Sequence, residues 1–274
     1  MQGDPPPPSL DEMLGLSPES DDDLSHTTGA AIAHVRAFGS LVRQTLHHAV
    51  RPGEPGAVAT QLYEIGVKSA VFLCVAMGFI GMIFVYQAGL QMKRVIPDLS
   101  QLGATYLELL VRDLAASICA LLLATRVGAG IAAELGSMVV TEQIDALRMC
   151  AADPVRFLVR PRFVASVAMT LVLTLLAGTV AFATGLWTAQ VFFAIHPQTF
   201  ADASLVDRGD VVVGGLKCLA YGAAIPLISA DSGLATRGGS AGVGQATTRA
   251  VVGSSLAVIV LNFVISAIGF AVFG

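Results

Sequence analysis

Three ionisable residues, Arg112, Asp113 and Lys217, interrupt long apolar runs of the sequence. An ionisable side chain inside a membrane span is costly and by default marks a functional site, with its partner facing a cavity or the bundle interior. These groups could bind the charged part of a substrate. Alternatively Asp113, Lys217 or His196 could act as acid or base on a lipid. A purely structural ion pair is the third interpretation.

Asp113 and Lys217 are expected to be partners because they lie at matching depths. Each follows the outer end of its apolar segment, Thr105 or Gly209, by about eight residues, which is ~12 Å along a helix. Arg112 is adjacent to Asp113, and neighbours on a helix point about 100° apart. Arg112 must therefore face a different partner.

The composition indicates which elements position these residues. Hydrophobic residues make up 54% of the 274 residues and charged residues 13%, and the mean hydropathy is +0.72. A soluble domain of this length does not need so much apolar surface. Two charge-free windows, Ser69–Met92 and Ala250–Gly274, are each long enough to cross a hydrocarbon layer of ~30 Å.

We therefore predict an all-α, polytopic membrane protein with five transmembrane helices. The third apolar stretch, Phe163 to Ala201, is too long for one straight crossing, and His196-Pro197 breaks its pattern, so we end that span near Ile195. The predicted spans cover about residues 69–92, 105–133, 163–195, 209–234 and 250–273.

The first 56 residues precede the spans. Residues 1–28 are acidic and proline-rich, and because this composition does not support packing we predict that they are disordered. Residues 29–56 place apolar side chains at helical spacing from Ile32 to Leu46 and end in RPGEPG. We predict an N-terminal amphipathic helix in the membrane interface, followed by a linker. The alternative is a soluble helix packed on a partner.

The distribution of basic residues favours a cytoplasmic N-terminus, because cytoplasmic loops carry the excess of lysine and arginine. In this orientation most basic residues outside the spans lie on the inner side, and only Lys93, Arg94 and Arg208 lie outside. The segment between the second and third spans then faces the cytoplasm.

That segment, residues 134–162, is charged and helix-forming. Thr141 is predicted to cap a short helix with Glu142 and Asp145 in its first turn and Arg148 toward its end, which suits the helix dipole. A short charged helix held between two spans is suited to docking on another protein, whereas the alternative is an ordinary solvated loop helix.

A second short helix is predicted to follow the first. Asp153 would cap it, Pro154 would occupy its first position, and Pro161 would stop it before the third span.

Four residues on one face of the first span, Phe84, Ala88, Gln91 and Met92, recur at helical spacing. They could line an apolar cavity for acyl chains. Packing between helices explains the same spacing equally well.

Three stretches of the sequence resemble one family. AELGSMVVTEQIDAL, DPVRFLVRPR and ATTRAVVGSSLAV are similar to segments of the Mla/YrbE-type permeases of ABC transporters that work with MCE proteins. The resemblance covers about residues 57–274, which form the expected permease domain. It implies a permease subunit that moves phospholipid or a related lipid between the bacterial inner membrane and a periplasmic MCE protein.

The resemblance also implies partners and sites. The segment between the second and third spans would be the coupling helix on a separate ATPase, with Glu134, Thr141, Glu142, Asp145 and Arg148 as coupling residues. Two permease copies would pair around a lipid cavity open to the periplasm. The cavity would have the arginine–acid pair, Arg112 and Asp113, and Lys217 near it.

The sequence departs from the family pattern at two positions. Relatives often have glutamate where this chain has Asp113, and some have an acid where it has Asn262.

Other chemistry is not indicated. The sequence contains no Walker A motif, so ATP and Mg²⁺ are expected on the partner ATPase and no cofactor is expected in this chain. The four cysteines, Cys74, Cys119, Cys150 and Cys218, lack metal-ligand spacing. No nucleic-acid partner is expected. An intramembrane lipid-modifying enzyme that uses Asp113 and Lys217 is the alternative function.

Overall fold

The computed structural model describes residues 36–49, 55–95 and 99–273, and within these residues the secondary structure is helical, without a β-strand. The chain divides into two units, residues 1–44 and residues 45–274. Residues 36–49 are helical, in agreement with part of the predicted amphipathic helix. Its place in the membrane interface stays a prediction, and the predicted disordered tail lies outside the described residues.

Five helices among the described residues are long and apolar enough to cross a membrane, which confirms the predicted number of spans. They are Gly56–Arg94, Leu102–Val140, Val155–Phe193, Arg208–Leu234 and Gly239–Phe273. The third ends slightly before the predicted boundary, because Ala194 takes a left-handed backbone conformation with φ 55°.

Several of these helices contain π-helical turns. The first consists of α3 (Pro55–Leu62), the π turn η1 (Tyr63–Val67) and α4 (Lys68–Val95). The second consists of α5 (Leu102–Leu109), η2 (Leu110–Leu114), α6 (Ala115–Leu123), η3 (Ala124–Gly128) and α7 (Ala129–Val140). Such widened turns are frequent at functional sites, and η2 contains both Arg112 and Asp113.

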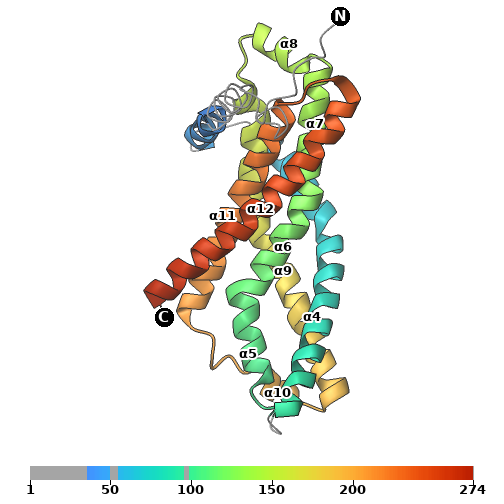
Figure 1. Ribbon diagram of the computed structural model, residues 1–274, viewed down its shortest axis with the longest axis vertical. Coiled ribbons are helices and arrows are strands. Elements are labelled where there is room, and N and C mark those ends of the chain that lie inside the picture. The colour runs from blue at the N-terminus through green and yellow to red at the C-terminus, as the bar shows by residue number, and fades with distance from the viewer. Residues whose placement is uncertain (1–35, 50–54, 96–98, 274) are drawn as a thin grey trace, which may run out of the picture. The chain divides into compact units, whose positions relative to one another are not determined.

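The remaining elements follow in order. They are α8 (Gln143–Met149), η4 (Val155–Val159), α9 (Arg160–Phe193), α10 (Pro197–Phe200), α11 (Arg208–Leu234) and α12 (Gly239–Phe273). Figure 1 shows α8 and α10 at opposite ends of the long helices.

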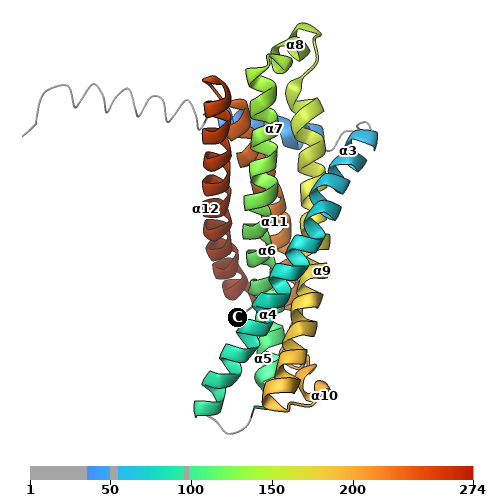
Figure 2. The same cartoon turned by 90° about the vertical axis from the view of Figure 1, so that its right-hand side faces the viewer.

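Packing within the second unit centres on α9 and α11. α9 contacts α4 and α11, and α11 also contacts α7 and α12; Figure 2 shows α4 beside α9. Gly81 lets α4 approach α9 closely, since a Cβ there would collide with the backbone of Ala181. The core contains the fully buried side chains of Leu73, Met77 and Tyr221.

Large apolar side chains also cover the outside of the long helices. Val71 of α4 is 75% exposed and Phe263 of α12 is 76% exposed. Soluble monomers rarely expose large continuous apolar patches, so this surface agrees with helices that face lipid.

The approach to the third span corrects one prediction. Oδ1 of Asp153 accepts a hydrogen bond from the amide of Val155 at 3.0 Å, and the helix begins at Pro154, as predicted. The expectation that Pro161 stops this helix is wrong, because η4 continues directly into α9. Pro161 lies in the first turn of α9, and the wide π turn before it gives the ring more room than a regular α-turn.

Candidate functional site

Polar side chains from three turns of α11 meet polar side chains of neighbouring helices within the apolar part of the second unit. Asp210, Lys217 and Tyr221 are spaced seven and then four residues apart, which places them on one side of the helix. The contacts that they form are Asp210 with Arg112, Lys217 with Asp113, and Tyr221 with Asn262. We call these six residues the polar column.

The central contact of the polar column is the ion pair of Asp113 and Lys217. Nζ of Lys217 lies 2.6 Å from Oδ1 of Asp113, which confirms the predicted pairing. The Lys217 side chain is completely buried, whereas that of Asp113 is 36% exposed. Oγ of Ser117, one turn further along the helix, donates a second hydrogen bond to Oδ1 of Asp113 at 3.1 Å. The carboxylate therefore joins α11 to the second long helix.

Arg112 has a separate partner, as its position beside Asp113 predicts. Its Nη1 lies 3.4 Å from Oδ1 of Asp210. Oδ2 of Asp210 accepts the amide hydrogen of Asp207 at 3.0 Å and so completes a capping box at the start of α11. Sequence reasoning did not identify Asp210. Its spacing of seven residues before Lys217 was the available signal.

The polar column ends at Asn262. The hydroxyl of Tyr221 donates to Oδ1 of Asn262 at 3.1 Å and links α11 to α12. Asn262 is the position at which the sequence was expected to depart from an acid of the resembling family. In this chain a neutral amide accepts the hydrogen bond, so the charged part of the column ends at Lys217.

Close packing of two helices positions the column. A Cβ at Gly214 of α11 would collide with the carbonyl oxygen of Val111 in η2. Only glycine therefore allows this approach, which brings Lys217 within reach of Asp113.

Two cavities flank this contact. A charged cavity of about 420 Å³ is lined by residues that include Glu108, Arg112, Arg208 and Asp210. An apolar cavity of about 470 Å³ lies between the second long helix, α9 and α11, and Leu110, Phe182 and Gly214 are among its residues. The first suits a polar headgroup and the second suits an acyl chain, since each matches the chemistry of its lining.

The predicted stripe on the first span packs against the core. Phe84, Ala88 and Met92 are partly buried against the core cluster, and the ring of Phe84 lies 5.8 Å from that of Tyr106. Gln91 is exposed. The packing interpretation thus accounts for three of the four residues within one chain, and contact with acyl chains stays a prediction for all four.

A short helix, α8, is present where the coupling helix was predicted, but its start differs from the prediction and its coupling role stays a prediction. Thr141 does not cap it, because the N-cap is Glu142, which takes a left-handed conformation with φ 58° and makes no side-chain cap. The Thr141 hydroxyl donates instead to the carbonyl oxygen of Ser137 in α7. The threonine thus belongs to the end of α7.

The two faces of α8 differ. Ile144 is buried, whereas Asp145 and Arg148 are 68% and 66% exposed and pair with each other at 3.0 Å. Glu142 is also exposed. The helix therefore presents a charged surface at the end of the long helices, available to a partner protein.

Glu134 lies on α7 rather than on α8. Its Oε1 is 2.6 Å from Nη2 of Arg162 in α9, and Nη1 of Arg162 donates to the carbonyl oxygen of Leu158 at 2.6 Å. The ion pair joins the two helices between which α8 is held. We call the segment from α7 to α9 that carries α8 the α8 hairpin.

The geometry does not favour acid–base chemistry at Lys217 or His196. Lys217 has no exposed surface to present to a substrate. His196 is exposed in the connection after α9, where its Nδ1 accepts the amide hydrogen of Gln198 at 3.4 Å and caps α10. A group that performs general acid–base catalysis must come within hydrogen-bond reach of the reacting atom, and a completely buried Lys217 does not offer this in the present arrangement.

Comparison with known proteins adds to this geometry. A family model described as Permease MlaE matches residues 58–268. A probable ABC transporter permease protein of Synechocystis is 37% identical over 208 residues, which are 75% of this chain and 79% of the relative.

Two further relatives have descriptive names. The chloroplast protein TRIGALACTOSYLDIACYLGLYCEROL 1 of Arabidopsis thaliana is 34% identical over 77% of this chain and 60% of its own length. The intermembrane phospholipid transport system permease protein MlaE of Haemophilus influenzae is 34% identical over 77% of this chain and 81% of its own length.

Proposed function

The chain belongs to the MlaE permease family, and from this premise we propose that it moves phospholipid or a related lipid between the inner membrane and a periplasmic MCE protein. It is a multi-pass membrane permease, not an enzyme. The observation that carries the proposal is the family match, because residues 58–268 reach into all five long helices. The name of the Haemophilus relative supports phospholipid as the substrate class.

A separate ATPase with bound ATP and Mg²⁺ would drive the movement, and α8 would dock on it. The exposed charges of Asp145 and Arg148 support this assignment, since charged surfaces steer and orient a partner. The buried Ile144 anchors α8 to its own chain. A displacement of α8 would then pass to α7 and α9, which the Glu134–Arg162 pair joins.

The lipid would meet the chain near the polar column. Arg112 is 35% exposed and borders the charged cavity, so its guanidinium is accessible to a phosphate, which arginine binds well. The completely buried Lys217 would not touch the lipid and would instead position the carboxylate of Asp113 through their ion pair. The apolar cavity across the Gly214 contact would take an acyl chain.

Two copies of the chain would form the transporter. The most apolar stretch of α12 is the least buried among those of the five long helices. Within that stretch 17% is buried, against 33–50% in the other four helices. The surface of α12 is available to a second copy, which would enlarge the lipid cavity at or beside the symmetry axis. A native mass with one permease copy in the active complex would rule out this part of the proposal.

Reconstitution tests the function. The permease, purified with its ATPase and placed in liposomes, should transfer a labelled phospholipid to an added MCE protein when ATP is hydrolysed. Mass spectrometry should find the lipid chemically unchanged. Conversion of the lipid without its transfer would favour the intramembrane enzyme instead.

A further inference from the structure

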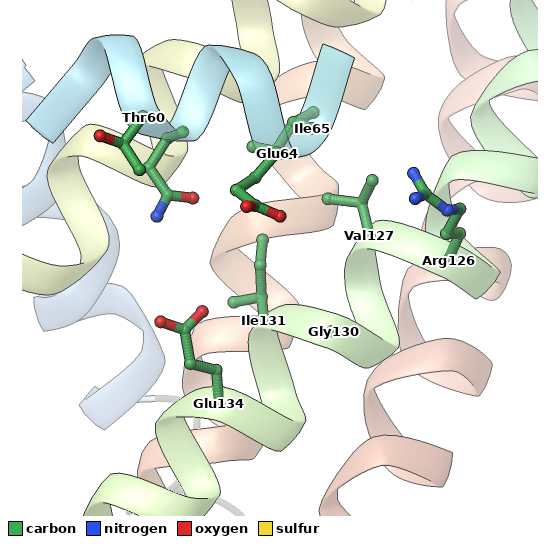
Figure 3. A pocket seen from close by; sticks show the side chains of 9 residues that line it. Thr60, Glu64, Ile65, Arg126, Val127, Gly130, Ile131 and Glu134 are labelled. Carbon is green, nitrogen blue, oxygen red and sulfur yellow. The ribbon is translucent and has the colours of Figure 1, made fainter. Parts of the chain in front are cut away.

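A second polar pocket lies far from the polar column, between the first and second long helices. Its volume is about 510 Å³, and its lining includes Thr60, Gln61, Glu64, Arg126, Gly130 and Glu134. Figure 3 shows Glu64 and Glu134 on opposite walls, with Ile131 between them and Arg126 at one side. We call it the Arg126 pocket.

Arg126 is the charge without an ionic partner in this pocket. Both carboxylate oxygens of Glu64 lie within 2.7 Å of Nζ of Lys68, and Glu134 pairs with Arg162. Nη1 of Arg126 donates to the hydroxyl of Ser69, and no carboxylate of residues 36–49, 55–95 or 99–273 pairs with it. Each glutamate is thus neutralised by a cation other than Arg126, and the positive charge of Arg126 remains uncompensated.

The position of the pocket along the first long helix indicates the headgroup layer of a membrane. Ser69, which Arg126 contacts, is the first residue of the charge-free window Ser69–Met92. Glu64 and Lys68 come directly before this window. Because a window of this length matches the hydrocarbon thickness, the pocket lies where lipid phosphates lie.

The pocket also has room for a ligand. Nothing lies within 4 Å of the point where a Cβ on Gly130 would stand. The guanidinium has five N–H donors in a fork that matches two phosphate oxygens, and the hydroxyl of Ser69 occupies only one nitrogen. Thr60 and Gln61 add polar groups on the opposite helix.

We propose that the Arg126 pocket binds the phosphodiester headgroup of a phospholipid, at the membrane surface on the α8 side. The phosphate binds the guanidinium of Arg126, and the polar part beyond the phosphate lies between Glu64 and Glu134. This site goes beyond the proposed transport function, because binding there requires only the permease itself.

The binding test uses purified permease in detergent, titrated with phosphatidylglycerol or with diacylglycerol of the same acyl chains, with bound lipid counted by native mass spectrometry. Wild type should bind the phospholipid more tightly than the diacylglycerol. Arg126→Gln should lower phospholipid affinity by about tenfold, the scale of lost charge-assisted hydrogen bonds. Gly130→Phe should lower it similarly without changing the charge, because its ring would occupy the pocket.

Two matched variants distinguish the pocket from general attraction at the interface. Arg249→Gln removes an exposed arginine from α12, and Gly244→Phe adds a ring where nothing lies within 4 Å. Both should keep wild-type affinity. Equal losses in the control variants, or equal binding of diacylglycerol, would overturn the proposal.

A third arm separates lipid from free phosphate. Inorganic phosphate at millimolar concentration should not displace the phospholipid, since it lacks the acyl chains. Displacement that depends on Arg126 would show that the site is one for soluble phosphate and would also overturn the proposal. Transport is not measured in any arm, so failure here leaves the transporter assignment intact.

Discussion

Nζ of Lys217, a side chain with no exposed surface, lies 2.6 Å from Oδ1 of Asp113, although 104 positions separate the two residues. The ion pair is unequal, since 36% of the Asp113 side chain is exposed. Loss of the carboxylate strands a completely buried cation, whereas loss of the cation leaves an anion that is only partly buried.

The first prediction follows from this inequality. Asp113→Ala should lower the free energy of unfolding by on the order of 3 kcal/mol, and Lys217→Met by less, because an unpaired buried charge is the costly product. The double variant Asp113→Ala with Lys217→Met should be more stable than Asp113→Ala alone, yet should transport less than wild type. Thermal unfolding of the detergent-purified variants measures this. Strictly additive losses would contradict the coupling.

The second prediction concerns the close approach at Gly214. Gly214→Ala should lower the unfolding temperature and reduce transport, because the added methyl group collides with the carbonyl oxygen of Val111 and separates the helices that carry Asp113 and Lys217. Gly215→Ala is the matched control, since nothing lies within 4 Å of its Cβ position. It should be neutral or stabilise the helix by up to about 1 kcal/mol. Equal losses of unfolding temperature at both positions would refute this explanation.

The third prediction concerns α8. Glu142→Lys with Asp145→Lys should weaken ATPase binding, measured by co-purification, and lower lipid-stimulated ATP hydrolysis. The variant should still insert and fold, because both side chains are exposed. Asp202→Lys, an exposed change in the connection between α10 and α11, should leave ATPase binding unchanged. Normal assembly and transport by the α8 variant would remove α8 from the coupling role.

The fourth prediction concerns the base of the α8 hairpin. The Arg162 side chain is 4% exposed and that of Glu134 is 57% exposed. Glu134→Ala should therefore lower the free energy of unfolding by about 3 kcal/mol, because it leaves the buried guanidinium without its carboxylate. Arg162→Met should lower it by less. Glu134→Asp should recover part of the loss. Unfolding midpoints in detergent test the order, and a larger loss for Arg162→Met would contradict it.

Local patterns in the sequence were sufficient for the helical architecture. The five spans follow from apolar segments matched to the hydrocarbon thickness. Asp153 caps a helix by accepting the amide hydrogen of Val155, two residues further along the chain. The pairing of Asp113 with Lys217 was also predictable, because membrane depth can be counted along each helix. Because all spans cross the same bilayer, residues at equal depth in two spans can be matched from the sequence.

Contacts that depend on helix rotation and local backbone conformation required the tertiary structure. Asp210 faces Arg112, and Glu134 faces Arg162, only because close packing turns those sides of the helices together. The start of α8 at a left-handed Glu142 and the continuation of the helix through Pro161 likewise departed from the residue preferences. The free energy of packing the surrounding helices outweighs local preferences worth about 1 kcal/mol for a helix cap and about 3 kcal/mol for a proline within a helix. The sequence of residues 134–162 therefore predicted a helix between two spans. The tertiary structure decided where that helix begins and that Arg162 pairs with Glu134 at its base.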